Sequence, residues 1–167
     1  MRKILIATAA GAAVVVGASA YAATTTTTFQ VTATVLKTCA VSATALLFGN
    51  YTPGAGAVNG TSTVSVNCTK TTPYSVALNG GTTTGGTVAQ RLMANGANSL
   101  QYNLYTTVAD TTVWGDGTGT SVTQSGTGAG VATANNLTVF GNLPDNATNQ
   151  AAVPGAYADT VTVTVTY

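Results

Sequence analysis

Apolar and polar residues alternate in several short stretches of this sequence, and this alternation constrains the fold more than any other feature. The stretches are residues 29–35, 63–68, 74–79, 100–106, 137–143 and 159–167. Successive side chains of a β-strand point to opposite faces of a sheet, so each stretch predicts a strand with one buried face. Segments rich in Gly and Asn, such as "NGGTTTGGT" and "WGDGTGT", separate the stretches and predict turns. The predicted fold class is all-β.

The number and spacing of these strands favour one architecture. Several short strands with Gly-rich turns are typical of an antiparallel sandwich of the immunoglobulin-like type. A closed barrel is the alternative, whereas a β-solenoid is disfavoured because the segments show no fixed repeat period. Residues 87–96, "TVAQRLMANG", have neither clear alternation nor turn signals, and they are compatible with a strand or a single helical turn.

The N-terminus has the pattern of a secretory signal peptide. Basic residues at positions 2 and 3 precede an apolar run over 4–16 and the small-residue stretch "GASAYAA". Cleavage after Ala22 fits best, and Ala20 and Ala23 are alternative ends. With residues 1–22 as the predicted signal peptide, 145 of the 167 residues remain, enough for one domain with a core. The apolar run is too short for a membrane span, and no later segment supplies about 20 apolar residues. An exported protein without membrane insertion is expected.

Charge and cysteine content narrow the function classes. Only 5% of the residues are charged, against about 25% in a typical soluble domain, so a surface of Thr, Ser, Asn, Gln and Gly is expected. Such a surface opposes self-association weakly. The three basic residues that follow the signal peptide are far apart, which excludes the basic cluster that nucleic acid or an anionic membrane surface would require. In an exported chain, Cys39 and Cys68 most simply form one disulfide.

The sequence offers little for catalysis or for binding a cofactor. After the signal peptide it contains no His and no Glu, and its four Asp are scattered, so we expect no enzyme, no metal site and no cofactor. The "DGTG" at 116–119 has too few acidic ligands for calcium and predicts a turn. An aromatic carbohydrate-binding surface built from Tyr102, Tyr105 and Trp114 is an alternative, although the alternation predicts that at least one of the tyrosines is in the core.

The first alternating stretch has no evident partner in its own chain. It places Phe29, Val31, Ala33 and Val35 on one face, and nothing around it predicts a tight turn that would fold it back. Burying Phe29, Val31 and Val35 would contribute about 1.5–3 kcal/mol each, and the sum is comparable with the stability of a whole domain. This strand is therefore expected to complete a fold.

The last stretch is the complementary feature. "DTVTVTVTY" places Val161, Val163, Val165 and Tyr167 on one face, and it lacks the Lys, Pro or bulge that usually protects an exposed edge strand. The two stretches can pair within one molecule or between two molecules. Pairing between copies would add an extended segment to a neighbour's sheet and would propagate head to tail into a filament.

The order of several segments resembles a known family. "FQVTATVLKTCAVSATALLFGNY", "VSVNCTKTTPYSVALNGG", "LQYNLYT", "WGDG" and "PGAYADTVTVTVTY" together resemble the spore coat protein U domain, a family that includes the major pilins of archaic chaperone-usher pili. The resemblance covers essentially the whole chain after the signal peptide. It implies an incomplete immunoglobulin-like sandwich that lacks its last strand and is completed by a donor strand from another subunit.

The resemblance also implies roles for particular residues and partners. Residues 23–36 would be the donor segment, with Phe29, Val31, Ala33 and Val35 as its inward side chains, and residues 37–167 would be the domain that carries the Cys39–Cys68 disulfide. Val161, Val163, Val165 and Tyr167 would border the acceptor groove and face a periplasmic chaperone, until an outer-membrane usher catalyses the exchange for the next subunit's donor. The boundary between donor and domain is left open between Val35 and Thr38.

The function implied is that of a structural pilus subunit. Such a subunit would pass through the periplasm to the cell surface, polymerise with copies of itself and support adhesion and biofilm formation. A structural protein of a spore or cell coat and a secreted lectin-like module are the alternatives.

Overall fold

The computed structural model describes residue 17 and residues 21–167, and the predicted signal peptide lies mostly outside the described residues. The chain divides into two units, one ending at Thr34 and one spanning Val35–Tyr167. In the first unit, residues 21–34 are all exposed and contain no helix or strand. All helices and strands of the described residues belong to the second unit.

A five-stranded antiparallel sheet forms the larger layer of the domain. Its strands, in spatial order, are β1 (Cys39–Ala43), β2 (Val58–Cys68), β7 (Asn135–Leu143), β5 (Asn98–Tyr105) and β4 (Arg91–Asn95). The longest pairing joins β2 to β7 over nine consecutive residues of each strand. The alternation in β2 is reproduced as burial, because its even-numbered residues face the core from Ser62 to Cys68. A two-residue turn with Gly96 at φ +59° joins β4 to β5, and this positive φ suits glycine in a tight hairpin.

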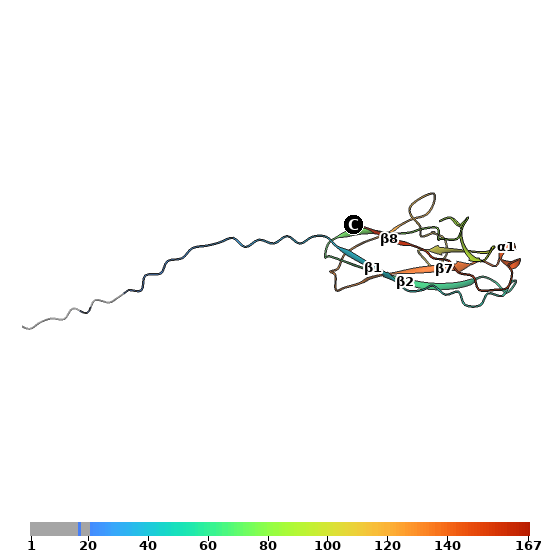
Figure 1. The fold of residues 1–167 in the computed structure, drawn as a ribbon, viewed down its shortest axis with the longest axis horizontal. Coiled ribbons are helices and arrows are strands. Elements are labelled where there is room, and N and C mark those ends of the chain that lie inside the picture. The colour runs from blue at the N-terminus through green and yellow to red at the C-terminus, as the bar shows by residue number, and fades with distance from the viewer. Residues whose placement is uncertain (1–16, 18–20) are drawn as a thin grey trace, which may run out of the picture. The chain divides into compact units, whose positions relative to one another are not determined.

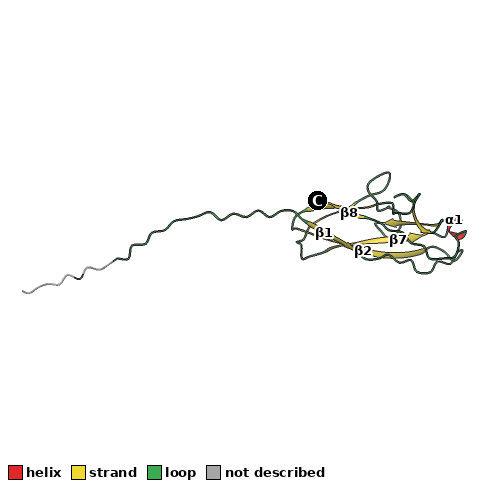
Figure 2. Ribbon diagram, viewed as in Figure 1, coloured by secondary structure: helices red, strands yellow, loops and turns green. Residues whose placement is uncertain are grey.

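A three-stranded antiparallel sheet forms the second layer. Its order is β6 (Gln124–Thr127), β3 (Pro73–Leu78) and β8 (Val163–Thr166). A single helical turn, α1 (Ala147–Gln150), follows β7 and is capped by Asn146. Figure 1 shows the start of β1 and the C-terminus at one end of the domain and α1 at the other end. Figure 2 shows that strands and loops account for nearly all of the described chain.

Trp114 and Arg91 tie the two sheets together in the core. Trp114 is fully buried; its backbone nitrogen donates to Leu104 of β5 (2.9 Å) and its Nε1 donates to the carbonyl of Val76 in β3 (3.0 Å). Arg91 of β4 is also fully buried and donates to the carbonyls of Leu78, Asn79 and Trp114 and to Oδ1 of Asn103. These bonds satisfy a buried cation with neutral acceptors, and they close this part of the sandwich.

Most predicted strands are present, with some differences in extent. Residues 63–68, 74–79, 100–106 and 137–143 largely fall in β2, β3, β5 and β7, and part of the ambiguous window 87–96 forms β4. The strand predicted over 159–167 is shorter, since β8 covers only Val163–Thr166 and Ala158 instead bonds to Ala94 at the edge of β4. Strands β1 and β6 and helix α1 were not predicted as separate elements.

Candidate functional site

An open groove of about 460 Å³ lies beside β8, and we call it the β8 groove. One wall is formed by residues 43–48, which continue from β1, and the other by residues 157–161 together with Val163. Core side chains form its floor, among them Val64, Leu78, Leu104 and Val139. Part of the hydrophobic core is therefore accessible from the surface through the β8 groove.

The groove exists because two sheet edges face each other without a strand between them. Strand β8 pairs with β3 on one side, and β1 pairs with β2 on one side; within the described chain neither strand has a partner on its other edge. Their nearest Cα atoms come within 8 Å. An added strand could therefore bond to β8 while its side chains fill the groove.

The stretch predicted to border the acceptor groove has the alternation of a buried strand, but its apolar side chains are only partly buried. Val161, Val163 and Val165 are partly buried and pack against the core, whereas Thr162, Thr164 and Thr166 are exposed. Val161 and Val163 line the β8 groove. Tyr167 lies outside the groove lining and is 55% exposed. The apolar face of this stretch is therefore left partly exposed to solvent in the single chain.

Two glycines allow the opposite wall to lie close to the sheet. Gly60 of β2 pairs with Gly141 of β7, and both face the core. A Cβ at Gly141 would lie 2.7 Å from Leu46 and 3.1 Å from Phe48, and a Cβ at Gly60 would lie 2.9 Å from the carbonyl oxygen of Leu47. Phe48 also packs edge-on against Tyr102, with ring centroids 5.9 Å apart. The apolar segment 46–48 therefore packs directly against the backbone of β2 and β7 at these two glycines.

Asp159 forms a polar corner in the groove wall. Its Oδ2 accepts a hydrogen bond from Tyr102 (2.6 Å), and its Oδ1 accepts from the backbone nitrogens and hydroxyls of Thr82 and Thr83 at 2.9–3.3 Å. Burial raises the pKa of Asp159, but these hydrogen bonds outweigh burial and leave the pKa below its usual value. Burial, together with the bond to Asp159, raises the pKa of Tyr102. Asp159 is therefore held ionised where the groove meets the loop 79–86.

A second groove of about 1000 Å³ continues from the first towards the α1 end of the domain. The two grooves share Leu46, Leu47, Phe48, Met93 and Tyr157. Asp145 fixes the loop on one side of the second groove by accepting hydrogen bonds from Tyr51 (2.6 Å) and from the backbone nitrogens of Gly54 and Gly56. The bond from Tyr51, followed by those from the glycines, holds the pKa of Asp145 at about 2.

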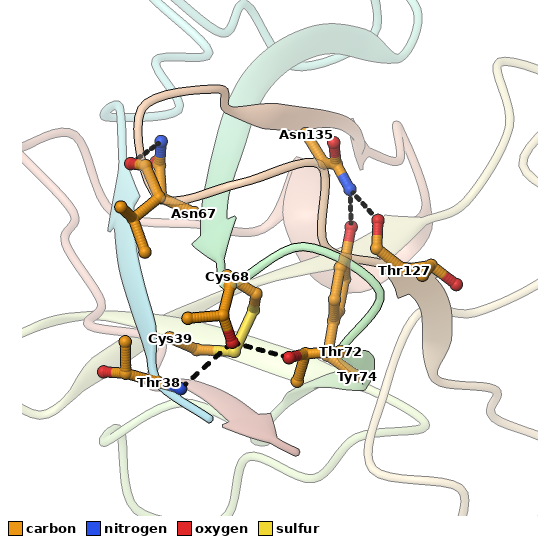
Figure 3. Close-up of a disulfide and its surroundings, with 10 residues drawn as sticks. Thr38, Cys39, Asn67, Cys68, Thr72, Tyr74, Thr127 and Asn135 are labelled. Carbon is orange, nitrogen blue, oxygen red and sulfur yellow. Dashed lines mark hydrogen bonds between the residues drawn. A yellow bond between two sulfur atoms is a disulfide. The ribbon is translucent and has the colours of Figure 1, made fainter. Parts of the chain in front are cut away.

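The predicted disulfide is confirmed. Cys39 and Cys68 are bonded and join the start of β1 to the end of β2, with Cα atoms 4.1 Å apart (Figure 3). Beside it, the backbone nitrogen of Thr38 donates to Oγ1 of Thr69 (3.3 Å), and Thr69 in turn bonds to Thr72 (2.6 Å). Among the described residues, Thr38 is the first along the chain that bonds to the domain in this way.

The residues predicted to act as a donor are exposed in the single chain. Phe29, Val31 and Val35 are 86%, 81% and 88% exposed, and Ala33 is exposed as well. These residues form no strand in the part of the chain that the structure describes. Their role as donor side chains stays a prediction.

The alternative carbohydrate surface is not assembled. Trp114 is fully buried and Tyr102 is only 6% exposed, so neither ring is available for stacking on a sugar. Asp116 accepts hydrogen bonds from the backbone and hydroxyl of Thr118, as expected for a turn. Within the described residues, no group of three or more His, Cys, Asp or Glu is placed to hold a metal ion, and no helix is long and apolar enough to cross a membrane.

One wall of the groove and its polar corner are not predicted by the alternation in the sequence. Residues 45–48, "ALLF", are apolar without alternation, and such a run is typical of a segment that packs on a sheet without forming a strand. Asp159 had a weaker signal: it is a lone carboxylate at the start of an otherwise uncharged alternating stretch. Its bonds to Tyr102 and to the loop 79–86 depend on residues distant in the sequence.

Comparison with known proteins identifies related sequences and structures. The family model of the Spore Coat Protein U domain matches residues 25–164. Among solved structures, the chain is similar to the crystal structure of the CsuC-CsuE chaperone-tip adhesion subunit pre-assembly complex from archaic chaperone-usher Csu pili of Acinetobacter baumannii, with 25% identity and a TM-score of 0.53. A comparison with curated proteins gave no match.

The family model and the solved structure both match most of this chain. The structural match covers 80% of this chain but 41% of the matched chain, so this chain spans about two fifths of the length of its structural relative. The two antiparallel sheets and the similarity to a pilus-subunit complex confirm the predicted immunoglobulin-like sandwich. Because the family model matches most of its length, the chain belongs to the Spore Coat Protein U domain family.

Proposed function

We propose that this protein is a structural subunit of an archaic chaperone-usher pilus and that it polymerises by donor-strand exchange. The observation that carries the proposal is the β8 groove, an apolar groove beside a strand whose second edge is unpaired within the described chain. The same chain carries an exposed segment with the matching alternation, Phe29 to Val35. Family membership and the similarity to a pilus-subunit complex support the same role.

In this mechanism the groove is filled in two steps. A periplasmic chaperone first lends an extended strand to β8, and an outer-membrane usher then catalyses its replacement by residues 23–36 of the next subunit. Each strand would gain main-chain hydrogen bonds along β8 and would bury apolar side chains against Val161 and Val163. Cover of the groove by a neighbour would make folding and assembly one process. The resulting filament would lie on the cell surface and serve adhesion and biofilm formation.

A pair of single substitutions tests this function. Val31→Asp places a carboxylate on the inward face of the donor and should abolish polymers of the full chain, because burying an unpaired charge in the groove is strongly unfavourable. Thr32→Asp is the matched control, since it adds the same charge on the outer face of the same segment and should still polymerise. Polymer length is measured by electron microscopy of the chain after export with its chaperone and usher. Normal filaments of Val31→Asp would overturn the proposal.

A truncation with added peptide provides a second test. A chain without residues 24–36 should not polymerise, and it should gain thermal stability when the missing segment is supplied as a free peptide. A truncated chain that is as stable as the full chain and indifferent to the peptide would contradict donor-strand exchange.

The name of the family favours one further candidate, a structural component of a spore or cell coat. Donor-strand pairing is compatible with either assembly, so the two candidates differ in the shape of the product. Electron microscopy of material sheared from cells separates them: thin filaments support a pilus, whereas sheets or amorphous layers support a coat.

A further inference from the structure

We propose a specific register for the donor strand in the β8 groove, and this register rests on the proposed donor-strand exchange. In it, residues 29–37 of one copy run antiparallel to residues 159–167 of another copy, the segment that contains β8. The facing pairs, donor first, are Phe29 with Tyr167, Val31 with Val165, Ala33 with Val163, Val35 with Val161, and Lys37 with Asp159. The last pair brings a donor ammonium group to the groove's carboxylate.

The direction of the donor follows from where the chain enters the domain. Cys39 and Thr38 lie at the disulfide end, and β8 runs towards that same end, because Thr166 pairs with Ser75 near the start of β3. Figure 1 shows β1 and the C-terminus together at this end and α1 at the opposite end. For copies to join head to tail, a donor must leave its acceptor at the α1 end and continue into its own disulfide end. The donor must therefore run antiparallel to β8.

The faces of the two strands restrict the register to steps of two residues. Val161, Val163 and Val165 point inward, so the inward donor residues must face odd-numbered positions. A slip of one residue would turn Phe29 and the donor valines to the solvent. In the proposed register, Val31, Ala33 and Val35 face the three partly buried valines, and Phe29 faces the exposed ring of Tyr167. Thr32 and Thr34 face the exposed Thr164 and Thr162. Facing threonines are a favourable cross-strand pair.

Charge decides between the registers that remain. Asp159 is the one charged residue among the described residues that line the β8 groove, and Lys37 is the one charged residue from position 23 to position 69. A slip of two residues in one direction would set Val35 against Asp159. A slip of two in the other direction would set Lys37 against Val161. Only the proposed register gives the carboxylate a cation and keeps both valines on apolar surface.

The geometry of β8 makes this register accessible to cross-linking. The carbonyl of Thr162 already accepts a hydrogen bond from Asn79, and its nitrogen donates to the Asn79 side chain, so this residue is bonded on the β3 side. Because bonding direction alternates along a strand, Thr164 is also directed towards β3. Thr164 and the donor residue facing it then form a non-hydrogen-bonded pair, with Cα atoms about 4.5 Å apart. That distance is within the range a disulfide can span, and both side chains lie on the outer face.

Three double variants of the full chain test the register. Thr32→Cys with Thr164→Cys should give a ladder of covalent oligomers in a boiled, non-reducing gel after mild oxidation of assembled polymer, and the ladder should disappear on reduction. Thr32→Cys with Thr162→Cys and Thr32→Cys with Thr166→Cys are matched controls, offset by two residues each way, and should give no ladder. All the replaced threonines are exposed, so the native fold and the Cys39–Cys68 disulfide should be retained.

The outcomes distinguish the register from the function on which it rests. A ladder from either offset pair, or from none of the three while electron microscopy shows polymer, overturns the register and leaves donor-strand exchange in place. Absence of polymer in the unsubstituted chain overturns donor-strand exchange and the register together.

The ion pair adds an independent measurement. Lys37→Glu should slow polymer assembly about two- to fivefold at low salt, in line with the modest strength of solvent-accessible ion pairs. The effect should shrink at high salt, because salt screens the repulsion from Asp159. Lys70→Glu makes the same charge change at an exposed site outside the groove and is the control. Equal effects of the two variants would count against the pairing of Lys37 with Asp159.

Discussion

Strands β2 and β8 have the same alternation of valine with small polar residues, but they differ in burial. Val64 and Val66 of β2 are 1% and 0% exposed, whereas Val163 and Val165 of β8 remain only partly buried. The difference lies in their neighbours. Strand β2 is paired on both edges, by β1 and β7, and its valines are covered by the opposite sheet; β8 is paired on one edge and borders an open groove. Alternation therefore identifies the face that needs cover, and the topology determines whether the same chain supplies it.

The largest expected effect lies in the closed part of the core. Trp114→Ala removes a fully buried indole that links β3 to β5, and it should destabilise the chain by about 3–5 kcal/mol. Equilibrium unfolding in urea, followed by far-UV circular dichroism, measures the change. A loss below about 1 kcal/mol would show that the closed part is not the main source of stability.

The disulfide is expected to have the second-largest effect. It lies at the end of the domain where β2 and β8 both finish. Replacing Cys39 and Cys68 together by Ala opens a loop of 29 residues and should cost about 3–4 kcal/mol by loop-closure entropy. Thermal unfolding of the variant and of the native chain, both without reductant, gives the difference. Similar melting temperatures would contradict the expectation.

Matched valine substitutions in β2 and β8 test whether the two strands differ in burial. In the single chain, Val64→Ala should cost about 2 kcal/mol, and Val163→Ala should cost less than about 1 kcal/mol, because its side chain is only partly buried. In polymer the donor would cover Val163, and the two costs should become similar. Unfolding of both variants in monomeric and polymeric form provides the data. A cost for Val163→Ala that is the same in both forms would break the proposed link between groove and assembly.

The smallest expected effect is a loss of stability in acid. Asp145 and Asp159 have lowered pKa values in the folded chain, so the unfolded chain binds more protons between its own carboxylate pKa, about 3.9, and the folded values. Their contribution is complete above about pH 4 and declines as the pH falls towards about 2, the folded pKa of Asp145. Urea midpoints at pH 5 and pH 3 measure the decline. Asp145→Asn should make the midpoint less dependent on pH, and an unchanged dependence would exclude Asp145 as a contributor.

The strands were predictable because burial and alternation coincide in them. The positions that alternation predicts to be inward, even-numbered in β2 and odd-numbered in β7, are buried or partly buried in the structure. The disulfide was predictable because the chain has two cysteines and was expected to be exported. Strand β1 was missed because four of its five residues are exposed, so it shows no buried face.

The walls of the groove were less predictable because they depend on contacts distant in the sequence. Leu46 and Phe48 pack on Gly60 and Gly141, which come from two different strands. Asp159 is oriented by Tyr102 and by the loop 79–86. Such sites are defined by the arrangement of the sheets, and local pattern does not contain that arrangement.

The glycine pair Gly60–Gly141 sets how far the segment 46–48 stands from the sheet, and so it sets the depth of the β8 groove. A single methyl group at Gly141 would displace Leu46 and Phe48 towards the space a donor would occupy. A substitution remote from β8 and from residues 23–36 could thus decide which neighbouring strands fit. The selectivity of assembly would then be adjustable from the interior of the sheet, by the size of two of its smallest residues.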